Sequence, residues 1–310
     1  MNQLIPTLNV TYFRSGHKKN RDFFVSQLKE AFETTGFFFL KNHSLNPQYD
    51  QTILEGAKDI FTEFFDLPLE IRKKYEFPEE KRQRGYTPMR IETGEFATVP
   101  DEKHFFQIGA DRNVWVPEVP ELKVMCNTLF SDFRSYSLVL LRAIALSLDL
   151  PENYFVEQEG NSIMRAIDYP ATATPLVDDA ETKNGGNIIG MCASKHTDIN
   201  MITLLEAKEE GLQLQHEGEW IPITISEPGL IIVNAGDMLQ HLTGGRYKSG
   251  THRVVCNKDT RRFSIPYFCH IRLDQSLVPL PHLGPSDLEK YPYKICEDYL
   301  NDRLKTIGLS

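Results

Sequence analysis

A run of short β-like segments between residues 162 and 268 constrains the fold of this chain more than any other feature. The segments are mostly apolar, and residues such as Gly, Pro and Asn separate them. They lie at residues 163–170, 191–198, 202–205, 211–215, 219–223, 230–234, 236–239, 250–255 and 262–268, which gives at least eight successive strands. Successive short strands of this kind are typical of a double-layered jelly roll. We therefore predict a mainly β core.

Helical patterns flank this core on both sides. Residues 20–35, 49–65 and 122–150 carry apolar side chains at helical spacing, and residues 285–307 return to helical character. Because the N-terminal helices need a sheet to cover, we predict a single domain with the N-terminal and central helices packed outside the jelly roll. Its expected parts are a helical and strand-containing half at 1–160, the jelly-roll core at 161–275 and a helical tail at 276–310, packed outside the barrel.

Net charge and cysteine usage narrow the class of protein. The 310 residues carry a formal charge of −9, which disfavours nonspecific binding to nucleic acid or to anionic membranes. No apolar run approaches membrane-spanning length. The five cysteines are scattered and lack CxxC spacing, which is typical of a reducing compartment, and we expect Cys192 and Cys256 to be buried filling. We expect a cytoplasmic protein and, as the simplest state, a monomer.

Two histidines and one aspartate in the β-rich core form a candidate metal site. Residues two apart on a strand share a face, so His196 and Asp198 would point into one cavity. A later strand carries His252. Two imidazoles and one carboxylate are the facial triad that holds Fe(II) and leaves other coordination positions open. An HxD pair alone more often reflects a histidine beside a solvated aspartate, and only its combination with the later residues makes it specific.

Arg262 and Ser264 form a candidate anion site on the following strand. They are also two residues apart, and a guanidinium beside a hydroxyl suits a carboxylate. His270 shares their parity and is a candidate for the rim of the pocket, whereas His43 fits a structural role better. The chain contains no GxSxG, P-loop or GxGxxG motif. These residues predict a metal site with an anion-binding pair beside it.

Several motifs resemble the isopenicillin N synthase-like branch of the 2-oxoglutarate- and Fe(II)-dependent dioxygenases. They lie in order at residues 36–43, 64–75, 195–198, 211–213, 233–237, 247–254 and 262–268. The resemblance implies a distorted jelly roll, or double-stranded β-helix. It further implies that His196, Asp198 and His252 hold Fe(II). Arg262 and Ser264 would bind the distal carboxylate of 2-oxoglutarate, with a hydroxyl from Tyr169.

The reaction implied by the resemblance consumes O₂ and 2-oxoglutarate and releases succinate and CO₂. It would oxidise a C–H bond of a small molecule by hydroxylation, desaturation or cyclisation. One alternative is an Fe(II) oxidase of the same fold that does not use 2-oxoglutarate, because such relatives keep an Arg-x-Ser pair for another anion. Another is a metal-free binding protein that keeps the fold.

The substrate pocket is the least defined part of this expectation. Plant members often carry Asn where this chain has Ile167, and the family's Lys-Glu reads Lys103-His104 here, which we expect to alter the pocket. Candidate pocket residues are Tyr86, Arg90, His104, Phe106, Arg165 and Phe268. For Arg165, a role in packing or in a surface salt bridge is as well supported as a role in the pocket.

Overall fold

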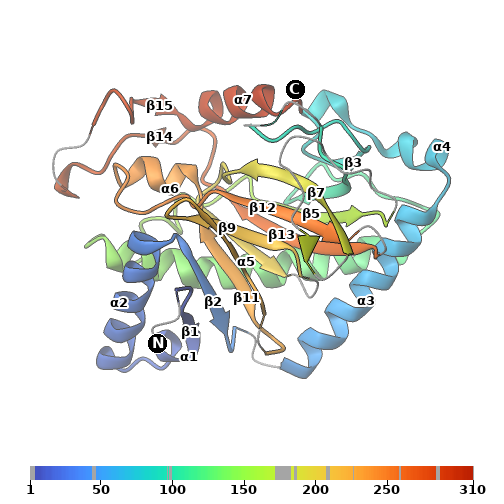
Figure 1. Cartoon of the computed structure of the whole chain (residues 1–310). Coiled ribbons are helices and arrows are strands. Elements are labelled where there is room, and N and C mark those ends of the chain that lie inside the picture. The colour runs from blue at the N-terminus through green and yellow to red at the C-terminus, as the bar shows by residue number, and fades with distance from the viewer. Residues whose placement is uncertain are drawn as a thin grey trace.

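The strands of the computed structural model form two main sheets that build the jelly roll (Figure 1). The structure describes residues 4–43, 47–95, 97, 100–171, 183–184, 187–206, 210–225, 227–257, 260–283 and 287–309. The larger sheet runs in the order β1 (Thr7–Asn9), β2 (Phe37–Lys41), β11 (Ile231–Ala235), β8 (Ile202–Glu206), β13 (Arg262–Cys269), β5 (Ile163–Tyr169), β4 (His104–Gly109) and β3 (Gly85–Thr87). The smaller sheet runs β10 (Glu219–Pro222), β9 (Leu212–His216), β12 (His252–Asn257), β7 (Asn187–His196) and β6 (Lys183–Asn184).

The chain passes back and forth between these sheets. From β7 onward it enters the larger sheet at β8, the smaller at β9 and β10, the larger at β11, the smaller at β12 and the larger at β13. Such crossing lets the buried faces of both sheets share one core. The predicted jelly roll is therefore confirmed. The strand expected at residues 236–239 was wrong, because these residues begin the helix α6 (Asp237–Leu242). Strands of the segment before residue 160 join the larger sheet, and the division into 1–160, 161–275 and 276–310 stays a prediction.

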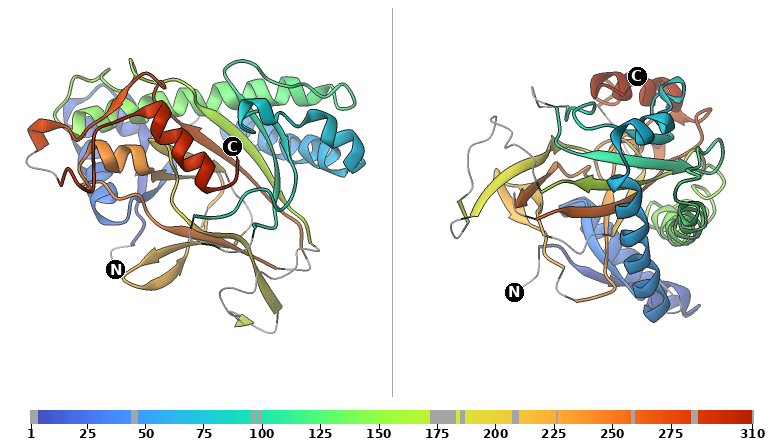
Figure 2. Two further views of the ribbon diagram at one scale, coloured as in Figure 1. Left: turned by 90° about the horizontal axis from the view of Figure 1, so that it is seen from above. Right: turned by 90° about the vertical axis from the view of Figure 1, so that its right-hand side faces the viewer.

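Helices cover the sheets from outside. The described helices are α1 (Val10–Arg14), α2 (Lys18–Thr34), α3 (Pro47–Asp66), α4 (Leu69–Arg72), α5 (Glu121–Ser147), α6 (Asp237–Leu242) and α7 (Cys296–Thr306), with 3₁₀ turns at Lys73–Tyr75, Pro78–Glu80 and Pro281–Leu283. The long α5 packs on β4, β8 and β13, and the right-hand view of Figure 2 shows it end-on beside them. Its buried stripe includes Phe133 and Ile144, and burying each such side chain stabilises the fold by about 2 kcal/mol.

Gly36 joins α2 to β2 at a point where no side chain fits. Its φ is +79°, and a Cβ there would lie 2.0 Å from the carbonyl oxygen of Lys248. Glycine alone adopts this conformation without steric cost. The close approach fixes where β2 enters the sheet, next to β11.

Strand pairing in both sheets positions the candidate site. In the smaller sheet β12 pairs with β7 so that His252 lies opposite His196. In the larger sheet β13 pairs with β5 so that Arg262 lies opposite Tyr169 and Ser264 opposite Ile167. Because alternate residues share a face, the two pairings bring distant parts of the chain to one cavity.

Cys192 and Cys256 form a disulfide between β7 and β12, with their Cα atoms 5.8 Å apart. Both are buried as expected, but the expectation that they only fill space was wrong. Antiparallel pairing of the two strands brings the side chains within bonding reach, which single-strand patterns do not reveal. The remaining cysteines, 126, 269 and 296, are buried thiols.

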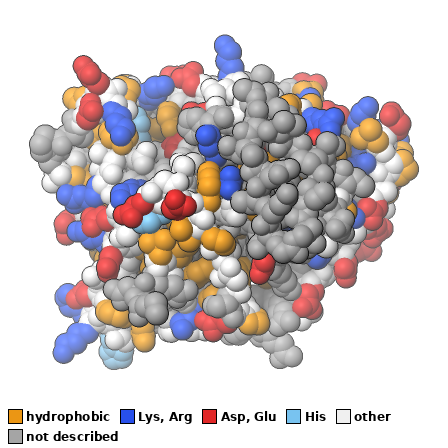
Figure 3. Space-filling view, in the orientation of Figure 1, with side chains coloured by type: hydrophobic (Ala, Val, Ile, Leu, Met, Phe, Trp, Pro, Cys, Tyr) orange, Lys and Arg blue, Asp and Glu red, His pale blue; other side chains and the backbone are white. Residues whose placement is uncertain are grey.

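The exterior carries charges of both signs. On the described part of the face in Figure 3, Lys and Arg side chains alternate with Asp and Glu. Among the described helices, none has both the length and the apolar character needed to cross a membrane.

Candidate metal centre

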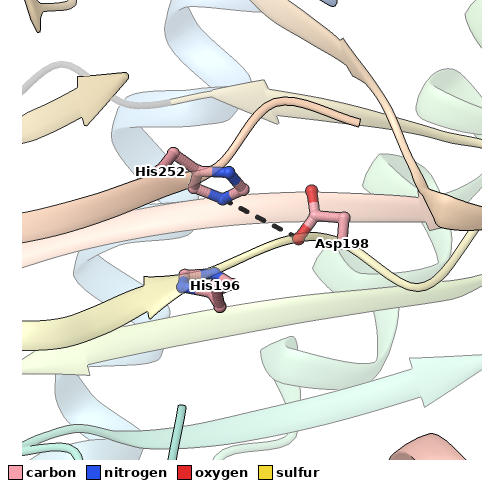
Figure 4. Close-up of side chains that lie close together, drawn as sticks. All are labelled: His196, Asp198 and His252. Carbon is pink, nitrogen blue, oxygen red and sulfur yellow. Dashed lines mark ion pairs between the residues drawn. The ribbon is translucent and has the colours of Figure 1, made fainter. Parts of the chain in front are cut away.

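His196, Asp198 and His252 converge on one point of the cavity (Figure 4). His196 ends β7, Asp198 follows it and His252 begins β12. The two imidazole rings lie 4.3 Å apart, and His252 Nε2 lies 3.8 Å from Asp198 Oδ1. One ligand atom from each residue lies within 4.8 Å of the others. The arrangement matches a two-histidine, one-carboxylate facial triad.

Both imidazoles are oriented by backbone carbonyls. His196 Nδ1 lies 2.7 Å from the carbonyl oxygen of Ser194, and His252 Nδ1 lies 3.0 Å from that of Gly250. Because a carbonyl oxygen only accepts, each Nδ1 carries the proton and donates it. Each Nε2 therefore keeps its lone pair for a metal, which is the usual arrangement around ligand histidines.

The carboxylate of Asp198 is held in the same way from behind. Its Oδ2 accepts hydrogen bonds from Thr203 Oγ1 at 2.5 Å and from Asn234 Nδ2 at 2.8 Å, so Oδ1 is left to the metal side. Burial opposes its ionisation, but the two histidines and these hydrogen bonds outweigh it and lower the pKa of Asp198. Burial and the neighbouring His252 lower the pKa of His196 to about 4. Neutral imidazole and ionised carboxylate are the forms that bind a metal.

Arg262 and Ser264 lie in the same cavity, as their spacing predicted. Arg262 Nη1 donates to Ser264 Oγ at 3.3 Å, and its Nε donates to the carbonyl oxygen of Glu210 at 3.1 Å. The guanidinium carbon lies 5.0 Å from the centre of the Tyr169 ring. These contacts hold a planar donor group beside the triad, which suits a carboxylate.

Two family models match most of the chain. That of the 2OG-Fe(II) oxygenase superfamily matches residues 160–271, and that of the N-terminal region of non-haem dioxygenases in morphine synthesis matches residues 5–125. The 2-oxoglutarate-Fe(II) type oxidoreductase hxnY of Emericella nidulans is 30% identical, over 91% of this chain and 84% of the relative. This chain belongs to the 2OG-Fe(II) oxygenase superfamily.

Solved structures agree. Full-length T7H of Neurospora crassa, in complex with alpha-KG and thymine, has a TM-score of 0.81 and 26% identity, covering 97% of this chain and 96% of that one. A 2OG-Fe(II) oxygenase family protein of Caulobacter crescentus has a TM-score of 0.77 and 30% identity, covering 97% and 98%. The oxygenase is therefore an Fe(II)- and 2-oxoglutarate-dependent enzyme that oxidises a C–H bond of a small molecule, consuming O₂ and releasing succinate and CO₂. These relatives favour this assignment over an oxidase without 2-oxoglutarate and over a metal-free binding protein.

The cavity of the oxygenase extends well beyond the triad and the Arg262 pair. Its charged lining residues comprise four carboxylates and four cations: Glu92, Glu95, Asp101 and Asp198, and Lys103, Arg165, Arg262 and Arg303. Burial lowers the pKa of two lining histidines, His196 and His270, to about 4. The formal charges of the lining therefore cancel.

Two of the six candidate pocket residues line this cavity, Arg165 and Phe268, and so does His270. Tyr86, Arg90, His104 and Phe106 are not among the described residues that line it. The Arg90 side chain is 60% exposed and pairs with Glu102. The structure thus places these four side chains outside the described cavity lining.

Alternation along β4 explains why the side chains of His104 and Phe106 do not line the cavity. His104 Nε2 lies 2.7 Å from Asp168 Oδ2, and the Phe106 ring lies 4.9 Å from that of Phe64. Both therefore face away from the cavity, whereas Gln107, at the opposite parity, lines it. The Tyr86 side chain lies with His104 outside the cavity lining, and its hydroxyl is 3.1 Å from His104 Nδ1.

The sequence did not identify several polar residues that line the cavity, among them Glu92, Asp101 and Gln107. Glu92 and Asp101 lie in the connection between β3 and β4, which has no periodicity to indicate its inner face. Gln107 lies directly opposite Arg165 in the β4–β5 register, a pairing that the sequence alone does not show.

The C-terminal tail contributes to the cavity. Within the described part of residues 276–310, only Cys296–Thr306 form a helix of α type, and β14 (Ser276–Leu277) pairs with β15 (Lys294–Ile295) before it. Leu300, Arg303 and Leu304 of α7 line the cavity, which the sequence did not predict. Apolar spacing predicts that one helix face is buried, but it does not say against what.

Proposed function

We propose that His196, Asp198 and His252 hold the ferrous ion and that Arg262, Ser264 and Tyr169 hold the distal carboxylate of 2-oxoglutarate. The observation that carries this assignment is the set of free ligand atoms, two Nε2 and one Oδ1, that remain after every other polar atom of the triad has a protein partner. The donor set fits ferrous iron, which accepts imidazole nitrogen and carboxylate oxygen. When bound, the ion couples O₂ reduction to decarboxylation of the keto acid and to oxidation of the substrate.

The protein's own part in this chemistry is positioning. Ser194 and Gly250 fix the two imidazoles, while Thr203 and Asn234 fix the carboxylate. The Arg262 fork fixes the far end of the keto acid, so its other end is directed to the open side of the triad. Apolar residues between these groups, among them Leu205, Leu212 and Val254, limit water access.

The decisive experiment compares His196→Ala with His216→Ala. Under anaerobic conditions His196→Ala should lose stoichiometric Fe(II) binding, and in air it should lose succinate formation. His216 lies at the end of β9 outside the described cavity lining, so its replacement should leave both unchanged. Full iron binding and full succinate formation in His196→Ala would refute the assignment.

The substrate does not follow from likeness to relatives. Thymine is bound in one solved neighbour, and a relative from Glycine max, 30% identical over 83% of this chain, is a homoarginine-6-hydroxylase. These two molecules differ in charge and shape. Hydroxylation, desaturation and cyclisation remain the candidate outcomes, and product mass from a metabolite screen distinguishes them.

Monomeric state and cytoplasmic location stay predictions, which light scattering and cell fractionation test. The cytoplasmic location was expected from the scattered cysteines, and the Cys192–Cys256 disulfide counts against that argument.

A further inference from the structure

A chain of buried charges forms one wall of the cavity, at residues 92, 101, 103, 107 and 165; we call it the polar wall. Arg165 Nη1 lies 2.9 Å from Glu92 Oε2, and Lys103 Nζ lies 2.7 Å from Glu92 Oε1. The same Nζ lies 2.7 Å from Asp101 Oδ2. Two cations thus face two carboxylates, and Gln107 is neutral. The polar wall therefore carries no net charge.

The Arg165 guanidinium is held rigidly within this wall. Its Nε donates to Gln107 Oε1 at 2.7 Å. Its central carbon lies 4.0 Å from the centre of the Phe105 ring and 5.2 Å from that of Phe268. No described residue forms a hydrogen bond with Nη2, the second terminal nitrogen of Arg165. A fixed donor beside an aromatic face is thus left for a ligand.

The position of Arg165 along β5 separates it from the 2-oxoglutarate end. It precedes Tyr169 by four residues on the same face, which corresponds to about 13 Å along a strand. Tyr169 lies opposite Arg262, so the Arg165 end of the polar wall is remote from the 2-oxoglutarate pair. The other end of the wall lies near the triad, because Asp101 Oδ1 accepts a hydrogen bond from the amide of Ser194.

We infer that the polar wall binds a neutral, flat part of the substrate through an oxygen acceptor such as an amide or ring carbonyl. Arg165 donates to that oxygen, and the flat face lies on Phe268. This inference rests on the proposed function, because Fe(II) and the 2-oxoglutarate dianion cancel each other's charge in the rest of the cavity. A carboxylate or an ammonium group would lose its hydration here without meeting a free counter-charge. A carbonyl loses less hydration and gains a charge-assisted hydrogen bond.

Three probes of one shape test the charge preference: benzamide, benzoate and benzamidine, which are neutral, anionic and cationic. Each is titrated by ligand-observed NMR into the full-length protein, kept anaerobic with Fe(II) and saturating 2-oxoglutarate so that Arg262 is occupied. Benzamide should bind at least about tenfold more tightly than either charged probe. Tighter binding of benzoate or benzamidine, equal binding of all three or no binding of any would overturn the inference.

Variants that change the charge of the polar wall should change which probe binds most tightly. Arg165→Met leaves the wall with one negative charge, so benzamide should weaken about tenfold and benzamidine should become the preferred probe. Glu92 keeps its contact with Lys103 in that variant. Glu92→Gln leaves one positive charge, so benzoate should become preferred. Arg112→Met, at a side chain that is 60% exposed on the surface, is the matched control and should keep the wild-type order.

Titration of 2-oxoglutarate in the same samples separates the two levels of failure. If 2-oxoglutarate does not bind with Fe(II), the proposed function fails. If it binds normally but the variants leave the probe order unchanged, only the inference about the wall fails. A purely structural role of Arg165 would lower stability without exchanging the preferred probe.

Discussion

Arg262 offers the sharpest test at the scale of single residues, because its guanidinium contacts both Ser264 and the Tyr169 ring. In Arg262→Gln we expect the KM for 2-oxoglutarate to rise by about 30-fold, since the loss of charge-assisted hydrogen bonds costs about 2 kcal/mol. Steady-state kinetics measures the change, and anaerobic Fe(II) binding should stay as in the wild type. An unchanged KM would remove Arg262 from the cosubstrate site.

Glu92 makes a prediction about pH. Burial favours its protonated form, but Arg165 and Lys103 outweigh this and lower the pKa of Glu92 to about 2, from its usual 4.5. A lowered folded-state pKa stabilises the fold above the unfolded value and ceases to do so as pH falls toward the folded value. The difference in unfolding free energy between wild type and Glu92→Gln should therefore shrink from about pH 6 to about pH 3.

Urea denaturation at both pH values measures that difference. Glu70→Gln, at a side chain that is 84% exposed, serves as the control and should show little pH dependence relative to wild type. A constant difference between wild type and Glu92→Gln would mean that Glu92 ionises equally in the folded and unfolded chains.

At this scale the sequence predicts the site unevenly. Arg262 and Ser264 are two residues apart on β13, and Asp198 follows His196 by two residues where β7 ends, so strand-like alternation places each pair on one face. The polar wall instead depends on contacts between Arg165 on β5 and residues of an irregular connection. No period indicates which side chains of such a segment point inward.

Among the elements, the junction between α2 and β2 is the most sensitive to a single methyl group. Gly36→Ala should destabilise the fold by about 3 kcal/mol, because it adds a clash with the Lys248 carbonyl to the cost of a positive φ. Gly16 also has a positive φ, +74°, but nothing lies within 4 Å of a Cβ placed there. Gly16→Ala should therefore cost only about 1 kcal/mol. Urea denaturation of both variants isolates the clash, and equal losses would contradict it.

Element types followed from the sequence more reliably than element neighbours. Residues 122–150 were predicted as a helix, and α5 spans Glu121–Ser147. The sequence shows the apolar positions of both α5 and α7. Only the fold shows that α5 packs on the larger sheet and that α7 lines the cavity. Periodicity reports burial within one element, whereas the partner depends on the topology of the whole chain.

On the scale of the whole molecule, Arg303 connects segments that are far apart in sequence. It pairs with Glu95 in the connection before β4 and with Asp237 at the start of α6, the latter at 3.1 Å. In Arg303→Gln, hydrogen exchange should increase together at residues 92–95 and at residues 296–309. The affinity for 2-oxoglutarate should change by less than about threefold, because Arg262 lies on another strand.

Lys305→Gln is the control, because that side chain is exposed on the same helix. Mass spectrometry of exchanged peptides reads both segments in one experiment. Faster exchange in α7 alone would mean that the ion pairs do not link the two segments.

The C-terminal end of the chain is built into the enzyme. The amide of Thr93 donates to the carbonyl oxygen of Ile307 at 3.0 Å, and the Leu309 side chain is buried. Figure 1 shows α1, near the first described residues, on the opposite side of the molecule from α7. A bulky fusion joined close to Leu309 would disturb this packing beside the cavity and obstruct entry of its reactants. Expression vectors should therefore carry such additions at the amino end.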